Sequence, residues 1–158
     1  MAFFVQTRKR INDHICAVNR GVFQEQWQRG QPILIANSSE HIDKRLWHPE
    51  SFARDFGHIK HDLINCLTGQ IIPKAPLVKF WRGFQFIKDR LEDTSGKPML
   101  LKLKDWPPTE DIADFMPRRF NDLLNGFPMK EYTKREGFLN MAGYLPDHYL
   151  KPELGPKV

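Results

Sequence analysis

The sequence predicts an α+β fold, and three observations point to this fold class. Segments whose apolar residues alternate, as in strands, are interspersed with segments whose apolar residues recur at helical spacing. Hydrophobic residues make up 41% of the 158 residues, which is sufficient for a packed core. Glycine and proline interrupt the apolar segments at short intervals, so we expect short elements joined by turns and proline-rich loops.

The first elements that the sequence predicts are a helix and a short strand. Residues 19–29 place Phe23 and Trp27 four positions apart, on one face of a helix. Gly30 follows directly, and glycine is common just beyond the end of a helix. The apolar run at residues 33–36 then predicts a short buried strand.

A second helix and a hairpin are expected next. Pro49 suits the first position of a helix that carries aromatic residues on one face. Residues 63–67, which are mostly apolar, and Ile71-Ile72 flank Thr68 and Gly69, which are typical of a turn. This arrangement predicts two antiparallel strands joined by a tight connection.

The second half of the chain has clearer periodicity. Residues 76–84 carry apolar side chains at i, i+3, i+4 and i+7, which predicts an amphipathic helix with a buried aromatic side. The polar residues 93–98 predict a loop. Met99, Leu101 and Leu103 alternate with the residues between them, which predicts a strand that the following Trp-Pro-Pro segment ends.

Two further helical segments complete the expected fold. Thr109 is expected to cap a helical turn that reaches Phe115. Pro117 is expected to start a longer helix that Gly126 closes. We expect one main apolar cluster from these elements, made of Phe80, Trp81, Phe84, Leu101, Leu103, Phe120, Leu123 and Leu124.

The charge and cysteine content exclude several classes of protein. The 24 Lys and Arg residues exceed the 19 Asp and Glu residues, but the excess is spread along the chain and indicates no nucleic-acid-binding face. Cys16 and Cys66 lack the spacing of a zinc or redox site, and such cysteine usage is typical of a reducing compartment. No apolar run is long enough to cross a membrane, so we expect a soluble intracellular protein.

A colinear series of segments carries a family resemblance. It covers most of residues 30–157 and comprises GQPILIAN, LWHPESF, DLINCLTGQII, FWRGF, LKLKDWPP, FMPRRFNDLL, EYTKREG and LNMAGYLPDHYLKPELGPK. The series resembles the front half of a Jumonji C (JmjC) domain of the histone lysine demethylase family 3 class, which includes hairless-type proteins. Residues 1–29 match this class loosely. The resemblance therefore divides the chain into a poorly matched N-terminal extension with a helix, residues 1–29, and a partial JmjC domain, residues 30–158.

The resemblance carries implications for fold and activity. Proteins of this class are Fe(II)- and 2-oxoglutarate-dependent dioxygenases with a cupin-like double-stranded β-helix, and they remove methyl groups from lysine nine of histone H3. The implied setting is the nucleus, in transcription regulation, with the histone H3 tail and chromatin-associated proteins as partners. The iron ligands of the class are expected beyond residues 154–157. We therefore expect an incomplete domain that holds only the N-terminal flanking part and is inactive alone.

Two alternatives to the interpretation as a partial demethylase domain stay open. The chain could be a non-catalytic protein-interaction module, or it could be a gene-model fragment of the enzyme.

A non-haem iron centre needs two His and one carboxylate on one face of the metal. The segment His41-Ile42-Asp43 has the spacing of the first two ligands, and His148 could be proposed as the third. We reject this set because His41 and Asp43 lie in a polar connection and not in a strand. Both side chains are expected to be exposed and unimportant to any metal.

Other polar and aromatic residues have ordinary structural interpretations. His58 and His61 follow Gly57, where the preceding helix is expected to have ended. Asp105 is expected to cap a turn. The sequence thus assigns no catalytic, cofactor-binding or metal-ligating residue, and neither Fe(II) nor 2-oxoglutarate is expected to bind this chain. The four tryptophans are expected to lie in the core, where their indole N–H groups need hydrogen-bond acceptors. These residues are Trp27, Trp47, Trp81 and Trp106.

Overall fold

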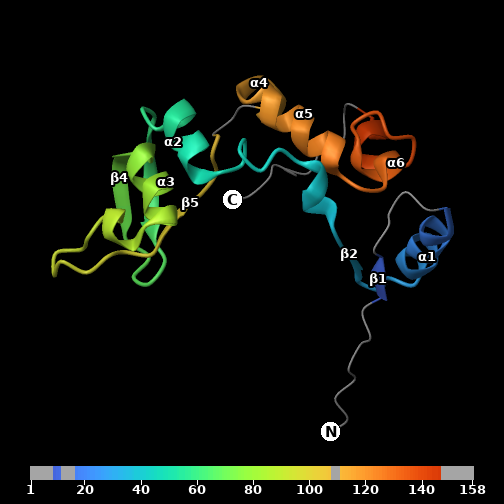
Figure 1. Cartoon of the computed structure of the whole chain (residues 1–158), viewed down its shortest axis with the longest axis horizontal. Coiled ribbons are helices and arrows are strands. Elements are labelled where there is room, and N and C mark those ends of the chain that lie inside the picture. The colour runs from blue at the N-terminus through green and yellow to red at the C-terminus, as the bar shows by residue number, and fades with distance from the viewer. Residues whose placement is uncertain (1–8, 12–16, 108–110, 147–158) are drawn as a thin grey trace, which may run out of the picture. The chain divides into compact units, whose positions relative to one another are not determined.

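The structure, a computed structural model, describes residues 9–11, 17–107 and 111–146 and contains both helices and sheets (Figure 1). The predicted α+β class is confirmed at this level. The described residues fall into two compact units. The first unit comprises residues 9–11, 17–42 and 120–146, and the second comprises residues 43–107 and 111–119.

The second unit is built on a three-stranded antiparallel sheet with the order β4-β3-β5. Leu63 lies at its centre, fully buried, and pairs with Ile72 on one side and Leu103 on the other. The predicted hairpin is confirmed, because β3 and β4 are consecutive and Gly69 takes a positive φ of 74° in the turn. The strands are β3 (Lys60–Asn65), β4 (Ile71–Pro76) and β5 (Leu101–Leu103).

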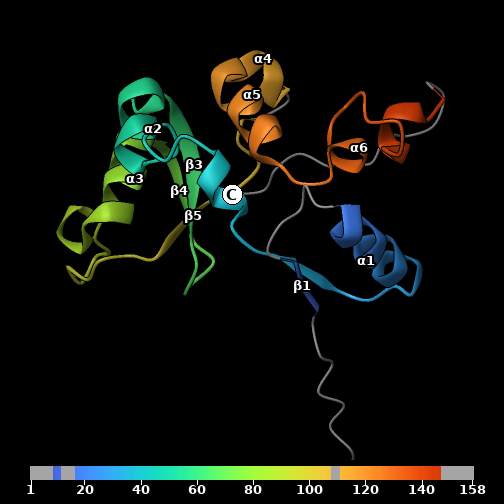
Figure 2. The same ribbon diagram turned by 45° about the vertical axis from the view of Figure 1, so that its right-hand side comes forward.

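Two helices, α2 (Pro49–Phe56) and α3 (Leu77–Gln85), cover one face of this sheet (Figures 1 and 2). Pro49 occupies the start of α2 as predicted, and the His48 side chain accepts a hydrogen bond from the Glu50 N–H. The first turn of α3 is fixed by hydrogen bonds from Leu77 N–H to the Ile59 carbonyl and from Val78 N–H to the Gly57 carbonyl. The end of one helix thus positions the start of the next.

The core of the second unit lies between these helices and the sheet. Aromatic rings fill it: Phe52 stacks on Trp81 with centroids 4.5 Å apart, and Trp106 meets Phe56 edge-on at 5.4 Å. The buried members of the cluster are Phe52, Ala53, Leu63, Ala75, Leu77, Phe80, Trp81, Leu103, Trp106 and Met116.

Helices α4 (Ile112–Phe115) and α5 (Pro117–Gly126) follow the sheet. Asp111 caps α4 by accepting a hydrogen bond from the Ala113 N–H. Thr109, the predicted cap, lies outside the described residues. The predicted start of α5 at Pro117 is confirmed, and the helix runs from the second unit into the first.

The described part of the first unit contains a small parallel sheet of two strands, one longer helix, three short helical segments and residues 120–126 of α5. Its cluster is small: Phe23 and Met129 are buried, and Tyr132 packs against them. The elements are β1 (Lys9–Ile11), α1 (Ala17–Gln28), β2 (Ile33–Ile35), α6 (Lys130–Thr133) and the 3₁₀ turns Ser38–His41 and Met141–Tyr144.

Several expectations about burial are wrong. Phe84, expected in the main cluster, is 57% exposed, because it lies at the edge of the buried face of α3. Trp27 stacks on Phe23 but is 65% exposed, because it lies at the border of the helical face that Phe23 centres. Leu34 points out of the predicted buried strand and is 52% exposed. The expected single cluster is divided, because Phe120 and its helical neighbours Leu123 and Leu124 belong to the first unit.

Candidate functional site

Among the residues that the structure describes, His41 and Asp43 are not joined by a third side chain that could complete a metal site. His41 is exposed at the end of a 3₁₀ turn, and Asp43 accepts a hydrogen bond from the Arg45 N–H at 3.0 Å. The predicted non-strand setting of this pair is confirmed, but Asp43 is half-buried and not fully exposed. His148 lies outside the described residues.

His58 and His61 also lie apart from any possible metal-ligand set in the described part of the chain. Gly57 ends α2 as predicted, His58 is exposed just beyond it, and the His61 Nε2 atom lies 3.0 Å from the Lys104 carbonyl. Within the described ranges, no three His, Cys, Asp or Glu side chains converge in a way that could hold a metal ion. These residues therefore do not fit the two-His, one-carboxylate centre of a non-haem iron oxygenase.

The tryptophans and Asp105 also have structural surroundings. Trp81 and Trp106 are buried in the aromatic core, where they meet edge to face with centroids 6.1 Å apart, so neither ring lines an open cage. Their indole N–H groups are buried without a hydrogen-bond acceptor in the described part of the chain. Asp105 is exposed, with a φ of 52° and its carboxylate 3.5 Å from the Lys104 Nζ.

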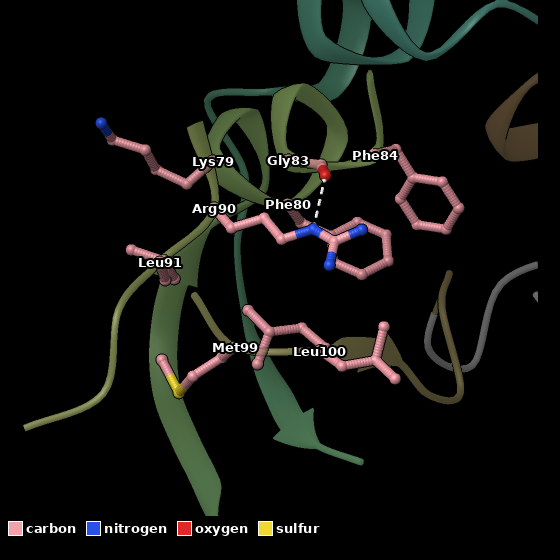
Figure 3. Close-up of a pocket in the computed structure, with 9 residues that line it drawn as sticks. Lys79, Phe80, Gly83, Phe84, Arg90, Leu91, Met99 and Leu100 are labelled. Atoms are coloured by element: carbon pink, nitrogen blue, oxygen red, sulfur yellow. Dashed lines mark hydrogen bonds between the residues drawn. The ribbon is translucent and has the colours of Figure 1, made fainter. Parts of the chain in front are cut away.

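A partly enclosed pocket of the second unit lies between α3 and the segment that leads into β5 (Figure 3). It has a volume of about 80 Å³, which is small beside the roughly 300–1,000 Å³ of typical small-molecule sites. Such a space suits one apolar side chain better than a cofactor. It is lined by Lys79, Phe80, Gly83, Phe84, Arg90, Leu91, Met99, Leu100 and Leu101.

Arg90 is held in this pocket by the backbone of α3. Its Nε–H donates a hydrogen bond to the Gly83 carbonyl at 3.0 Å (Figure 3). A Cβ atom at Gly83 would lie 3.1 Å from the Arg90 Cγ, so the bare glycine allows this close approach. The guanidinium is thereby positioned beside the apolar wall of the pocket.

A separate polar cluster joins α2 to the start of α5. Arg119 is 4% exposed, and its guanidinium donates to the Ser51 Oγ at 2.7 Å and to the Asp55 carboxylate at 2.8 Å. The same group lies over the rings of Phe52 and Phe56, 4.3 and 5.0 Å from their centroids. This arrangement satisfies a buried charge and fixes the two helices, which is a structural role.

The electrostatics of Asp55 follow from this cluster. The hydrogen bond from Arg54 is the largest cause that lowers the pKa of the Asp55 carboxyl. Partial burial opposes it, and Arg119 lowers the pKa of Asp55 further. Asp55 is therefore held ionised.

Sequence reasoning missed both Arg90 and Arg119. Arg90 lies in an irregular segment after α3, where no periodicity indicates which side chains meet. Arg119 stands next to the exposed Arg118 in α5, and the two arginines differ in sequence context too little to predict which is buried. Only the tertiary contacts separate them.

Comparisons with known proteins identify relatives of the chain. It is 51% identical over 149 residues to lysine-specific demethylase 3 of Drosophila melanogaster, and this match covers 94% of the chain and 17% of the relative. It is 46% identical over 140 residues to lysine-specific demethylase 3A of Homo sapiens, covering 89% of the chain and 10% of the relative. A third relative, the probable JmjC domain-containing histone demethylation protein 2C of Homo sapiens, is 38% identical over 148 residues, or 94% of the chain and 6% of the relative. No family model matches the sequence.

Proposed function

The chain is a relative of the lysine-specific demethylase 3 proteins, and we propose that it forms a non-catalytic part of a histone lysine demethylase of this JmjC class. The observation that carries the proposal is the identity of 51% over 94% of the chain to a segment that makes up 17% of the fly protein. On this proposal the chain is the N-terminal flanking part of the JmjC domain. The cupin-like β-helix of the domain belongs to the remainder of the full-length protein.

The chemistry of such an enzyme would reside outside the residues described. An Fe(II) and 2-oxoglutarate centre acting on methylated lysine nine of histone H3 needs ligands that this part of the chain does not bring together. The second unit instead supplies a helix-covered antiparallel sheet with an aromatic core. Its role in the proposal is that of a scaffold beside the catalytic β-helix, in a nuclear protein that acts on chromatin.

An exchange experiment tests the scaffold role. This chain replaces the matched segment of full-length Drosophila melanogaster lysine-specific demethylase 3, and formaldehyde release is measured with Fe(II), 2-oxoglutarate and a histone H3 peptide dimethylated at lysine nine. We expect the chimera to retain demethylation and the chain alone to show none.

Two controls make the outcome decisive. A chimera with Trp81→Ala, which leaves a cavity in the aromatic core, should lose activity together with thermal stability. A folded chimera without activity would contradict the scaffold role, and iron-dependent turnover by the chain alone would contradict its non-catalytic assignment.

A further inference from the structure

The pocket between α3 and β5 is bordered by apolar side chains that water reaches. Phe84 of α3 is 57% exposed, and Leu100, just before β5, is 47% exposed. Phe86 and Ile87, which follow α3 in the sequence, are also exposed, at 48% and 66%. Exposed apolar side chains beside a pocket are typical of a contact site for another molecule.

The charges at the pocket all have the same sign. Lys79 and Arg90 are the charged residues that line it, and both are cations. Neither forms an ion pair with any carboxylate among the residues that the structure describes. The chain as a whole carries +5 at pH 7, so a second copy would bring further positive charge to this surface.

The position of Arg90 is built into the fold. Its Nε–H donates a hydrogen bond to the Gly83 carbonyl, and this bond holds the guanidinium at the side of the pocket near Phe84 (Figure 3). The side chain is half-buried, so little of its conformational freedom would be lost when a ligand binds. Its terminal nitrogens present a planar pair of donors of the type that carboxylates accept.

We propose that this pocket binds an acidic peptide segment that inserts one large apolar side chain between α3 and β5. The apolar side chain would contact Phe80, Leu91 and Met99, and carboxylates beside it would meet Arg90 and Lys79. The volume matches one inserted side chain, and the sign of the charges selects against lysine- and arginine-rich segments. This inference is independent of the proposed scaffold role.

Direct binding to the full chain tests the proposal. The probe is a fluorescein-labelled peptide of seven residues with Leu-Phe at its centre and Asp or Glu on both sides, followed by fluorescence anisotropy at low salt. We expect saturable binding that weakens as salt is added. The same peptide with Ala-Ala at its centre, and a peptide with Leu-Phe between Lys and Arg residues, should both bind at least about tenfold more weakly.

Substitutions locate the site. Arg90→Glu and Lys79→Glu should each weaken binding of the acidic peptide about tenfold, because each brings a like charge to the carboxylates. Arg82→Glu is the control. It makes the same charge change on α3 outside the pocket lining, where the Arg82 guanidinium lies 3.8 Å from the Glu50 carboxylate, and it should leave binding within about twofold. Lys79 is exposed on α3, so its variant tests the site even if Arg90→Glu impairs folding.

Several results would overturn the proposal. Equal binding of the basic peptide would refute the charge selection, and equal loss in the Arg82→Glu variant would show attraction to overall charge and no specific site. An absence of peptide binding together with self-association in light scattering, abolished by Leu100→Asp, would assign the surface to a second copy of the chain.

Discussion

A buried arginine shows how single residues stabilise the second unit. Arg119 combines hydrogen bonds to Ser51, Asp55 and the Leu46 carbonyl with contacts to two aromatic faces. An arginine this deeply buried is tolerated because its donors are paired and its planar group stacks on rings. Asp55 accepts hydrogen bonds from both Arg119 and Arg54, so its ionised form is favoured by folding.

This coupling predicts how stability depends on acid. The folded-state pKa of Asp55 lies below its ordinary value of 3.8, so its ionised form adds stability above that value, and this stability is lost as pH falls through the folded-state pKa. Asp55→Asn should therefore lower the free energy of unfolding at pH 7 and flatten its decline between about pH 4 and pH 2.

Urea unfolding across this pH range measures the effect. Asp105→Asn is a matched control because Asp105 is an exposed aspartate, and we expect it to keep the acid dependence of the unmodified chain. Parallel stability curves for Asp55→Asn and the unmodified chain would contradict the role given to the Arg54 and Arg119 contacts.

At the scale of elements, the contact between α2 and α3 depends on a glycine. Gly57 ends α2 with helical dihedral angles, and a Cβ atom added there would collide with the Ala53 carbonyl oxygen of the same helix and lie 2.9 Å from the Val78 Cβ of α3. Its carbonyl also accepts the hydrogen bond from the Val78 N–H. The second helix can thus begin directly against the end of the first.

Two glycine substitutions should have opposite effects. Gly57→Ala should destabilise the protein by about 1–3 kcal/mol, because the methyl group collides with the Ala53 carbonyl oxygen and overpacks the contact with Val78. Gly21→Ala should stabilise it by about 0.5–1 kcal/mol, because Gly21 lies within α1 with nothing within 4 Å of the added Cβ. Denaturant unfolding of both variants measures the two changes in the free energy of unfolding. A stabilising Gly57→Ala would show that a methyl group fits at this contact and would contradict the role given to the glycine.

The sequence predicted most elements because their signals are local. The proline at the start of α2, the turn at Gly69 and the alternation around Leu101 depend on residues close together in the chain. The partners of each apolar face are not local, so periodicity placed Phe84 and Phe120 in one core with Trp81. Phe84 instead borders the pocket, and Phe120 lies beneath the Arg135 guanidinium in the first unit.

The candidate site was less predictable than the fold. The pocket forms from a helix and from a segment about twenty residues away in sequence, whose approach depends on the loop between them. The rejection of His41 and Asp43 as strand-borne ligands did follow from sequence, since their polar neighbours indicate a connection. The family resemblance was confirmed by the relatives, which match the chain along most of its length.

At the scale of the whole molecule, burial is distributed unevenly. The second unit has an extensive aromatic core, whereas the cluster of the first unit has Phe23 and Met129 as its buried members. Stability within a protein follows the local amount of buried apolar contact. The chain spans 17% or less of the relatives described above, which are correspondingly longer proteins.

Hydrogen exchange should reveal this imbalance. Backbone amides of β3 and α3 should exchange more slowly than those of α1 and α6, because opening the second unit exposes far more apolar surface. Mass spectrometry of pepsin fragments after deuterium labelling measures the rates. Equal protection in both units would show that they unfold as one cooperative body.

The three-stranded sheet has two unlike borders. In β4, Pro73 and Pro76 lack the N–H group that could donate to a further strand. Lys74 has a φ of 50°, and its N–H donates a hydrogen bond to the Asp62 carboxylate. Such a border resists the addition of another strand. β5 carries no proline and lies at the other border of the sheet as far as the described residues go. The two edges of the sheet therefore differ. A further strand, from the same polypeptide or another, can pair with β5, whereas the edge formed by β4 is protected against pairing.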